Sequence, residues 1–480
     1  MSIKKLIKLL IHGCLLWCFI FTSKGHSATN LPGALAAAIK ANDFTTDGIG
    51  LYINAVDSST PVVSFQAEQP LNPASVIKLL TTAASLDLLG PGYRWTTEVY
   101  YTGKLSNNTL NGDLYFHGKG DPYLTPERFW LLLNRIKIFG VHAITGNVYF
   151  DNTYFDPEPV DYNAFDNQPY RTYNVGPNAL LVGFQATEFH FSSRNKQIDI
   201  VPFPSSPKLK INNNVKLVNG RCGAWKKRLS LDTKIVKGVL NVNFSGRYAS
   251  ACDKRVLYRR VTDAEDHFQH YFLPLWQQLG GEFSGSIEKR KLPKDTSLVI
   301  SEASISLAEV VRFINKFSNN VMTRQLLLTL GAHSFESPGT TEKGIDVIKW
   351  WLDKHKLNGE ELKMVNGAGL SRDTRISATM LGKLLRFVYQ QSYMPEFISS
   401  LPVTGNDGAM ARRFKSRPLA GHAHIKTGLL DFVQSMAGYV TTATGKRYVV
   451  VMLHNHPRAH TKSAEKLQND VIEWTFNLEQ

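Results

Sequence analysis

The chain has 480 residues, of which 43% are hydrophobic and 20% are charged. These proportions exclude a disordered or fibrous protein and allow about two or three domains, each with a buried core. The formal net charge of +15 at pH 7 makes the chain strongly basic. A basic surface favours an anionic partner, although an ordinary solvated surface would carry the same charge.

The first residues have the pattern of a secretory signal peptide. Three lysines precede a largely apolar run from Leu9 to Thr22. The segment Gly25-His26-Ser27 follows and ends in small residues, as a cleavage site requires. We therefore expect residues 1–27 to be removed by cleavage after Ser27, with cleavage after Ala28 as the alternative. An uncleaved membrane anchor is disfavoured because the apolar run is shorter than the roughly 20 residues that span a bilayer.

Export bears on both the charge and the partners of the mature chain. Removing residues 1–27 takes away four lysines and no acidic residue, so the formal charge falls from +15 to +11. An exported protein is not expected to meet nucleic acid. The sequence therefore favours an anionic wall polymer, or loose contact with a membrane surface, and a location in the periplasm or cell envelope.

Four cysteines divide between the expected signal and the mature chain. Cys14 and Cys18 lie in the signal, where lipid attachment at Cys14 is an alternative that the neighbouring His12 fits poorly. Cys222 and Cys252 lie 30 positions apart in turn-rich sequence, and an oxidising compartment favours one disulfide between them. Such a bridge would contribute to stability rather than to chemistry.

The expected secondary structure divides the mature sequence into three stretches. Residues 28–94 contain an opening helix, a hairpin and a long helix, expected at 32–40, 49–65 and 75–88. Residues 95–292 change to short alternating strands separated by turn residues. From residue 293 onward four helices are expected, at 307–317, 321–330, 342–354 and 377–390. Three strands then close the chain before a last helix, at 424–427, 435–441 and 448–453. We infer an α/β (α+β) domain formed by residues 28–94 and 293–480 and split by a β-rich insertion at 95–292.

A first candidate motif opens the helix that begins near Ser75. In Ser75-Val76-Ile77-Lys78 the serine and the lysine share one helix face. A partly desolvated lysine beside a serine can take the hydroxyl proton, and the helix N-terminus offers backbone N–H groups to an oxyanion. Taken alone the motif is weak, because Ser-x-x-Lys occurs elsewhere in this chain.

Two further motifs follow downstream. Ser318-Asn319-Asn320 falls between two predicted helices, where a hydroxyl and an amide can project into a cleft. Lys426-Thr427-Gly428 occurs once, on a late strand. Its lysine supplies a positive charge, its threonine a hydroxyl, and its glycine room for a substrate backbone, a combination that suits a peptide with a free carboxylate.

The order of the three motifs is more specific than any one of them. Ser-x-x-Lys, Ser-x-Asn and Lys-Thr-Gly in this order characterise penicillin-binding proteins and serine β-lactamases. The sequence resembles the class C low-molecular-mass penicillin-binding proteins, a D-alanyl-D-alanine carboxypeptidase and endopeptidase family (S13-like). The 243 positions between Ser75 and Ser318 suit a family with large insertions there. Further landmarks of the resemblance are His117–Pro122, Gly146–Asp156, Tyr173–Pro177, Asn366–Arg372 and Leu401–Gly408.

The resemblance implies a β-lactamase/transpeptidase-like fold and a role for each motif residue. Ser75 would attack the carbonyl between two D-alanines, Lys78 would accept its proton, and Ser318 would relay a proton to the leaving amine. The substrate would be held by Asn320, Lys426, Thr427 and Gly428. The oxyanion would lie between the backbone N–H groups of Ser75 and Leu429, where the family often has serine or threonine at the second position. A side-chain contact to the substrate is therefore in doubt at Leu429.

The same resemblance implies the partners. They are peptidoglycan stem peptides as substrates and β-lactam antibiotics as covalent inhibitors, with no cofactor. A compact β-lactamase is disfavoured by the large insertion. A non-catalytic peptidoglycan-binding scaffold on the same fold is the main alternative, and a polyanion-binding envelope protein explains the charge but not the motif order.

A group of histidines is the alternative candidate site, for a metal ion. His454, His456 and His460 cluster after a late strand, with His422 and His424 upstream. No nearby cysteine or acidic residue completes a zinc pattern, so we expect these histidines to be ordinary loop residues and expect no metal.

Overall fold

The computed structural model describes residues 31–194, 197–357, 359 and 361–479. The expected signal peptide and its cleavage site lie outside the described residues. Within the described part of the chain, no helix is long and apolar enough to cross a membrane.

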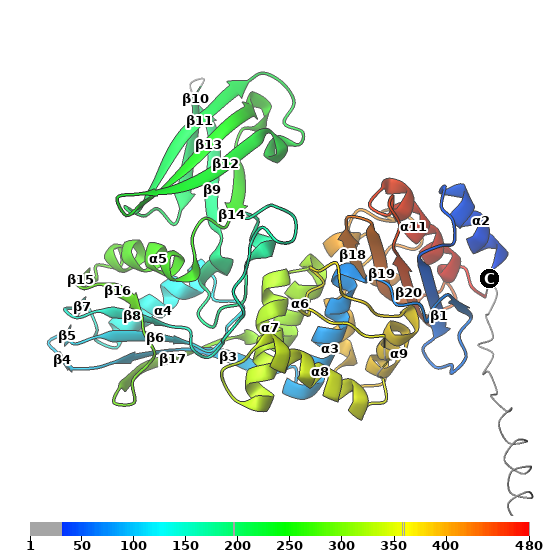
Figure 1. Ribbon diagram of the computed structural model, residues 1–480, viewed down its shortest axis with the longest axis horizontal. Helices are drawn as coiled ribbons and strands as arrows, with labels where there is room; N and C mark the ends of the chain where they lie inside the picture. The colour runs from blue at the N-terminus through cyan, green and yellow to red at the C-terminus, as the bar shows by residue number, and fades with distance from the viewer. Residues whose placement is uncertain (1–30, 195–196, 358, 360, 480) are drawn as a thin grey trace, which may run out of the picture.

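An antiparallel five-stranded sheet joins the two ends of the chain (Figure 1). Its strand order is β18-β19-β20-β1-β2, so N-terminal β1 lies beside C-terminal β20 in continuous register from Ile49↔His454 to Ala55↔Tyr448. Every residue of β1 is buried, because helices cover both faces of the sheet. The strands are β1 (Ile49–Ala55), β2 (Val63–Phe65), β18 (Ala423–Leu430), β19 (Val433–Thr441) and β20 (Arg447–His454).

Two helices pack on one face of this sheet and a larger helical layer packs on the other. The smaller layer contains α2 (Gly33–Ala41) and α11 (Lys462–Phe476). The larger layer begins with the 3₁₀ turn η1 (Ala74–Ile77) and α3 (Lys78–Leu89), and continues with α6 (Leu307–Phe317), α7 (Asn320–Phe335), α8 (Thr341–Lys354), α9 (Ala378–Tyr389) and α10 (Met394–Ser400). The expected α/β class is confirmed.

Side chains at the helix starts explain why several of these helices begin where they do. Ser306 accepts a bond from the Glu309 backbone N–H and the Glu309 side chain bonds back, which forms a capping box at α6. The α7, α8 and α9 helices have simpler N-caps, in which a side chain accepts a bond from the backbone N–H three residues later. The capping residues are Asn319, Thr340 and Ser377. Short polar residues thus set the boundaries close to the predicted positions.

The inserted region contains a five-stranded sheet and a four-stranded sheet beside it, covered by two helices (Figure 1). These helices, α4 (Pro126–Ile138) and α5 (Ala264–Gln278), were not predicted, so the insertion is less purely β than expected. The first sheet has the order β16-β8-β6-β3-β17. It contains β3 (Arg94–Tyr101), β6 (Leu114–Gly118), β8 (Val148–Asp151), β16 (Ile287–Lys289) and β17 (Ser297–Ser306); the second contains β4 (Lys104–Ser106), β5 (Thr109–Asn111), β7 (Ala143–Ile144) and β15 (Glu282–Phe283).

Strand β17 helps to define the boundary between the inserted region and the α/β domain that it splits. It pairs antiparallel with β3 over nearly its whole length. We therefore propose that the inserted region ends where α6 begins, at Leu307. The change from expected strands to expected helices in the sequence had placed this end after residue 292.

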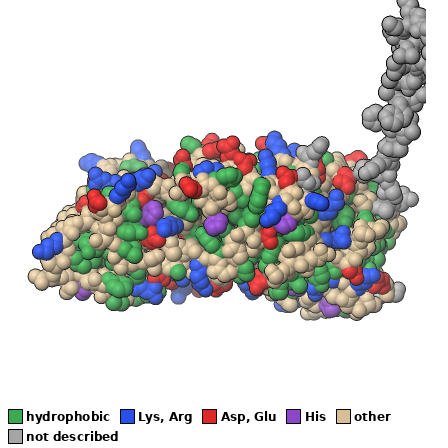
Figure 2. All heavy atoms as spheres, turned by 90° about the horizontal axis from the view of Figure 1, so that it is seen from below, with side chains coloured by type: hydrophobic (Ala, Val, Ile, Leu, Met, Phe, Trp, Pro, Cys, Tyr) green, Lys and Arg blue, Asp and Glu red, His purple; other side chains and the backbone are tan. Residues whose placement is uncertain are grey.

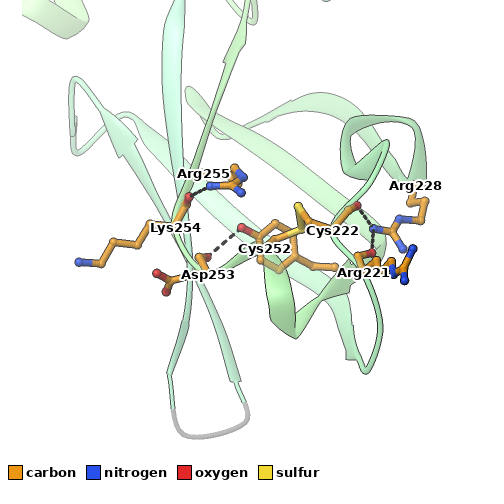
Figure 3. The surroundings of a disulfide bond; sticks show 8 residues. Arg221, Cys222, Arg228, Cys252, Asp253, Lys254 and Arg255 are labelled. Carbon is orange, nitrogen blue, oxygen red and sulfur yellow. Dashed lines mark hydrogen bonds between the residues drawn. A yellow bond between two sulfur atoms is a disulfide. The ribbon is translucent and has the colours of Figure 1, made fainter.

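A separate pair of three-stranded sheets forms the part of the insertion drawn uppermost in Figure 1. The sheets have the orders β10-β9-β14 and β11-β13-β12 and enclose a small aromatic core. Their strands are β9 (Thr187–Arg194), β10 (Gln197–Phe203), β11 (Leu209–Val218), β12 (Leu229–Val236), β13 (Val239–Ala249) and β14 (Arg255–Arg259). Cys222 and Cys252 are joined by a disulfide at the edge of this core (Figure 3).

We expect the double variant Cys222→Ser/Cys252→Ser to lower the free energy of unfolding of this sandwich by about 3 kcal/mol. The bridge closes a loop of 30 residues and so restricts the unfolded chain. Chemical denaturation followed by tryptophan fluorescence would measure the change, because Trp225 is buried in the same core. Equal stability of variant and parent protein would contradict the prediction.

Charge is distributed rather than gathered on the face shown in Figure 2. Lysine and arginine side chains are interspersed there with acidic and hydrophobic ones. On that face, the net positive charge of the chain does not form a continuous basic surface.

Candidate active site

The nucleophile candidate lies on a turn that the surrounding residues hold in place. Ser75 follows Ala74, whose φ of 46° is uncommon for a residue with a side chain. The Ala74 N–H donates to Oδ1 of Asn72 at 2.8 Å, and Nδ2 of Asn72 donates to the Ser371 carbonyl at 3.0 Å. Ser75 itself lies in the 3₁₀ turn η1, and the α-helix begins three residues later, at Lys78.

Lys78 lies against Ser75 and is fully buried. Its Nζ donates to Ser75 Oγ at 2.9 Å and to Asn320 Oδ1 at 2.7 Å, and it also donates to the Ala368 carbonyl. Burial, followed by the charges of Lys426 and Arg324, lowers the pKa of Lys78 well below its usual value. A neutral amine at this position can accept the proton of the Ser75 hydroxyl.

The Ser-x-Asn motif forms the junction between α6 and α7. Ser318 ends α6 in the left-handed conformation, with φ 56° and ψ 40°, and Asn319 caps α7 through the Met322 N–H at 3.0 Å. Because of this sharp junction, the side chains of Ser318 and Asn320 reach different partners. Asn320 contacts Lys78, whereas Ser318 Oγ accepts a bond from Lys426 Nζ at 3.0 Å.

The Lys-Thr-Gly motif lies on β18, which is an edge strand of the central sheet. Gly428 allows this strand to approach Ser75 closely: a Cβ at position 428 would lie 2.5 Å from the Pro73 carbonyl oxygen and 3.0 Å from the Ser75 nitrogen. Lys426 is 1% exposed and donates to Ser318 and, at 2.7 Å, to the Thr427 carbonyl. Burial lowers the pKa of Lys426 to about 7.

The structure therefore brings the three motifs to one place. Ser75, Lys78 and Asn320 form one hydrogen-bonded chain, and Ser318 with Lys426 forms a second. The Thr427 side chain is half-buried on β18, and Leu429 is 60% exposed one residue beyond Gly428.

Three basic side chains, Lys78, Lys426 and Arg324, meet around this centre without a carboxylate partner among the described residues. Among the described residues, neither Lys78 nor Lys426 forms an ion pair, and Arg324 donates to the carbonyls of Asn174 and Val175. Burial lowers the pKa of Arg324 to about 10. Positive charge left unpaired at a buried site favours an anionic ligand there.

Sequence reasoning missed a second group of residues, which holds the turn directly before Ser75. Asn455, at the end of β20, accepts from the Asn72 N–H at 2.8 Å and donates to the Asn72 carbonyl at 2.9 Å. Asn72 in turn fixes Ala74, directly before Ser75. The sequence separation of 383 positions left no local signal for this contact, apart from Asn455 standing between two histidines.

The expectation that the histidines are solvated loop residues is wrong for His454, which is the last residue of strand β20. His454 is buried, and its ring packs edge-on against Phe44 at 4.6 Å between centroids. Burial, and then His456, lowers the pKa of His454 to about 4. Among the described residues, no group of three or more histidine, cysteine or acidic side chains could hold a metal ion.

Comparison with known proteins identifies the family. Residues 31–478 match the D-Ala-D-Ala carboxypeptidase 3 (S13) family. The chain belongs to this family. A relative from Actinomadura sp. (strain R39), a D-alanyl-D-alanine carboxypeptidase, is 25% identical over 434 residues, which cover 86% of this chain and 79% of that protein. The carboxypeptidase DacB of Haemophilus influenzae is 21% identical over 465 residues, which cover 92% and 93% of the two chains.

Solved structures confirm the expected β-lactamase/transpeptidase-like fold. Penicillin-binding protein 4 of H. influenzae superposes with a TM-score of 0.77 at 20% identity, covering 92% of this chain and 99% of that one. A predatory endopeptidase of Bdellovibrio bacteriovorus gives a TM-score of 0.54 at 13% identity, covering 89% and 92%. Membership of the S13 family makes this chain a serine-type D-Ala-D-Ala carboxypeptidase, a penicillin-binding hydrolase that acts on peptidoglycan.

We expect Asn455→Ala to slow acylation of Ser75 by about 10-fold to 100-fold. The variant leaves the Asn72 backbone groups unpaired and loosens the turn that positions the nucleophile, and small misplacements of reacting atoms cost rates of this order. The time course of intact mass with a β-lactam would measure the rate. Asn406→Ala is the control, because Asn406 is exposed and makes no side-chain hydrogen bond to a described residue. A parent-like rate in Asn455→Ala would remove the positioning role.

Proposed function

We propose that this S13 enzyme cleaves peptidoglycan stem peptides ending in D-Ala-D-Ala through an acyl-enzyme on Ser75. The observation that carries the proposal is the 2.9 Å contact between Lys78 Nζ and Ser75 Oγ, at a lysine whose pKa burial lowers. A serine is a weak nucleophile until a neighbouring base takes its proton. Lys78 is that base in our mechanism.

Acylation forms one bond and breaks one. Ser75 Oγ bonds to the carbonyl carbon between the two D-alanines, and the hydroxyl proton moves to Lys78. The tetrahedral oxyanion accepts hydrogen bonds from the backbone N–H groups of Ser75 and Leu429. The C–N bond then breaks. The leaving D-alanine takes a proton from Ser318, and the two buried lysines, Lys78 and Lys426, replace that proton, so the proton first accepted by Lys78 is passed on.

Substrate binding uses the remaining motif residues. Lys426, with Thr427, holds the terminal carboxylate, and Gly428 leaves room for the peptide along β18. Asn320 lies beside Lys78 and binds the peptide amide of the substrate.

Water then attacks the ester carbon of the acyl-enzyme and gives a proton to the base. The ester bond breaks, Ser75 Oγ takes that proton back, and the shortened peptide is released.

The setting of the enzyme follows from the same proposal. The amino-terminal pattern indicates export, so the enzyme would act in the periplasm or at the cell envelope, with membrane contact no more than loose. β-Lactams would acylate Ser75 in place of the peptide. One structure of the H. influenzae relative is complexed with a β-lactam, which supports this expectation.

Intact mass after incubation with benzylpenicillin tests the nucleophile. The parent protein should gain one adduct, Ser75→Ala should gain none, and the exposed-serine control Ser245→Ala should behave like the parent. An adduct on Ser75→Ala would assign the reaction to another residue. A folded parent protein without an adduct would favour the non-catalytic peptidoglycan-binding scaffold.

A further inference from the structure

A cavity of about 470 Å³ lies in the inserted region, outside the active site. It is bounded by the loop at residues 167–171, by the 3₁₀ turn η4 (Trp225–Arg228) and by strands β12, β13 and β14. Four cations line it, Arg171, Lys226, Lys227 and Arg259, and none of its lining residues is acidic. The other polar lining groups are neutral.

We call this cavity, with its four positive charges, the basic cavity. None of them forms an ion pair with any residue that the structure describes. Burial, and then the charge of Arg171, lowers the pKa of Arg259 to about 10, as expected for two guanidinium groups that lie close together. Asp166, directly before this loop, instead accepts hydrogen bonds from the Tyr173 hydroxyl, the Asn174 side chain and the Gln168 backbone N–H.

The side of the basic cavity that carries the lysines is anchored to the sandwich core. Trp225 is buried and begins η4, so Lys226 and Lys227 project from a fixed turn. Arg228 donates to the Cys222 carbonyl at 2.5 Å, and Cys222 is bonded to Cys252 (Figure 3). The lysines are thus held close to the cavity before any ligand binds, which reduces the entropy lost on binding.

The other side of the basic cavity is formed by residues whose sequence neighbours lie around the candidate catalytic side chains. Arg171 directly precedes η2 (Thr172–Asn174), and the Tyr173 carbonyl accepts a bond from Asn320 Nδ2 at 3.5 Å. Tyr258, next to Arg259 on β14, lines a second cavity of about 280 Å³ together with Ser318 and Asn320. Neighbouring residues therefore face the basic cavity and the surroundings of the catalytic side chains.

We propose that the basic cavity binds carboxylate groups of a neighbouring stem peptide on the same peptidoglycan molecule whose D-Ala-D-Ala end occupies the active site. This inference rests on the proposed function, because it takes the substrate polymer as the ligand. Four unpaired cations suit a ligand with at least two negative charges, and wall peptides carry them as carboxylates. A polymer bound at one site also presents its other peptides to a nearby site at high effective concentration.

The test compares a polymeric substrate with a small one. We expect Lys226→Gln/Lys227→Gln to bind purified peptidoglycan sacculi about five-fold more weakly in a sedimentation assay, since each exposed charge pair contributes modestly. Hydrolysis of a soluble D-alanyl-D-alanine peptide and acylation by benzylpenicillin should match the parent protein. The control Lys291→Gln/Lys294→Gln removes the same charge from exposed lysines elsewhere and should bind normally.

Two further measurements separate the cavity and its ligand from general charge. Ser230→Trp places a large neutral side chain at an exposed lining position and should weaken binding as the glutamine pair does. Sacculi with amidated carboxylates should lose the difference between parent and variant. The inference is overturned if Ser230→Trp binds sacculi normally, or if the control pair weakens binding equally. It is also overturned if the difference between parent and variant persists after amidation. Binding of the parent protein to vesicles containing phosphatidylglycerol, but not to sacculi, would overturn it as well. Loss of the Ser75 adduct would instead overturn the proposed function.

Discussion

Replacing Lys78 with glutamine should slow acylation of Ser75 by benzylpenicillin by about 10³-fold, the middle of the range for loss of a general base. Glutamine keeps a polar side chain of similar reach that can still bond to Asn320 and to the Ala368 carbonyl. It cannot accept the Ser75 proton. The second-order rate constant, measured from the time course of intact mass, checks the expectation.

The same variant should remain as stable as the parent protein. Lys78 is buried, has no anionic partner among the described residues, and has a pKa that burial lowers, so removing the amine removes an unfavourable burial. The midpoint of thermal unfolding checks this, with the exposed Lys383→Gln as a matched control for both measurements. Acylation within a few-fold of the parent rate would assign the base to another group.

Lys78 also shows what the sequence could and could not predict at the site. The spacing of Ser75 and Lys78 predicted their contact, because both lie on one turn of chain. The cations that help to lower the pKa of Lys78 are Lys426 and Arg324, which come from distant segments. Only the folded arrangement brings those charges together, so the depressed pKa could be expected only by analogy.

The fold shows a similar division between local and distant signals. The boundaries expected for α6, 307–317, coincide with the observed ones, because a capping box and a strong apolar stripe mark that helix locally. Helix α4 had a comparable signal, since Phe129, Leu132, Leu133 and Ile136 are buried at helical spacing, but the surrounding turn-rich sequence concealed it. The pairing of β17 with β3 joins segments about 200 residues apart and had no local signal.

The carboxylate-binding role that we propose for Lys426 predicts a pH dependence that differs between two substrates. The folded pKa of Lys426 is lowered from 10.5 to about 7 by burial, so the free enzyme loses this positive charge as the pH rises through about 7. For a peptide with a free terminal carboxylate, kcat/KM should therefore fall above that pH. For the same peptide with an amidated terminus, this fall should be much smaller, because no carboxylate needs the charge.

The variant Lys426→Ala makes the same argument without titration. Removing one partner of a buried charge pair should lower kcat/KM for the free-carboxylate peptide by about 10²-fold or more. Lys426 also donates to Ser318, so part of the loss will affect both substrates through the proton relay. The ratio of the two kcat/KM values isolates carboxylate binding, because the relay contribution cancels from it. If the parent enzyme prefers the free-carboxylate peptide and Lys426→Ala retains that preference in full, another group must bind the carboxylate, and Arg324 is then the buried cation to test next.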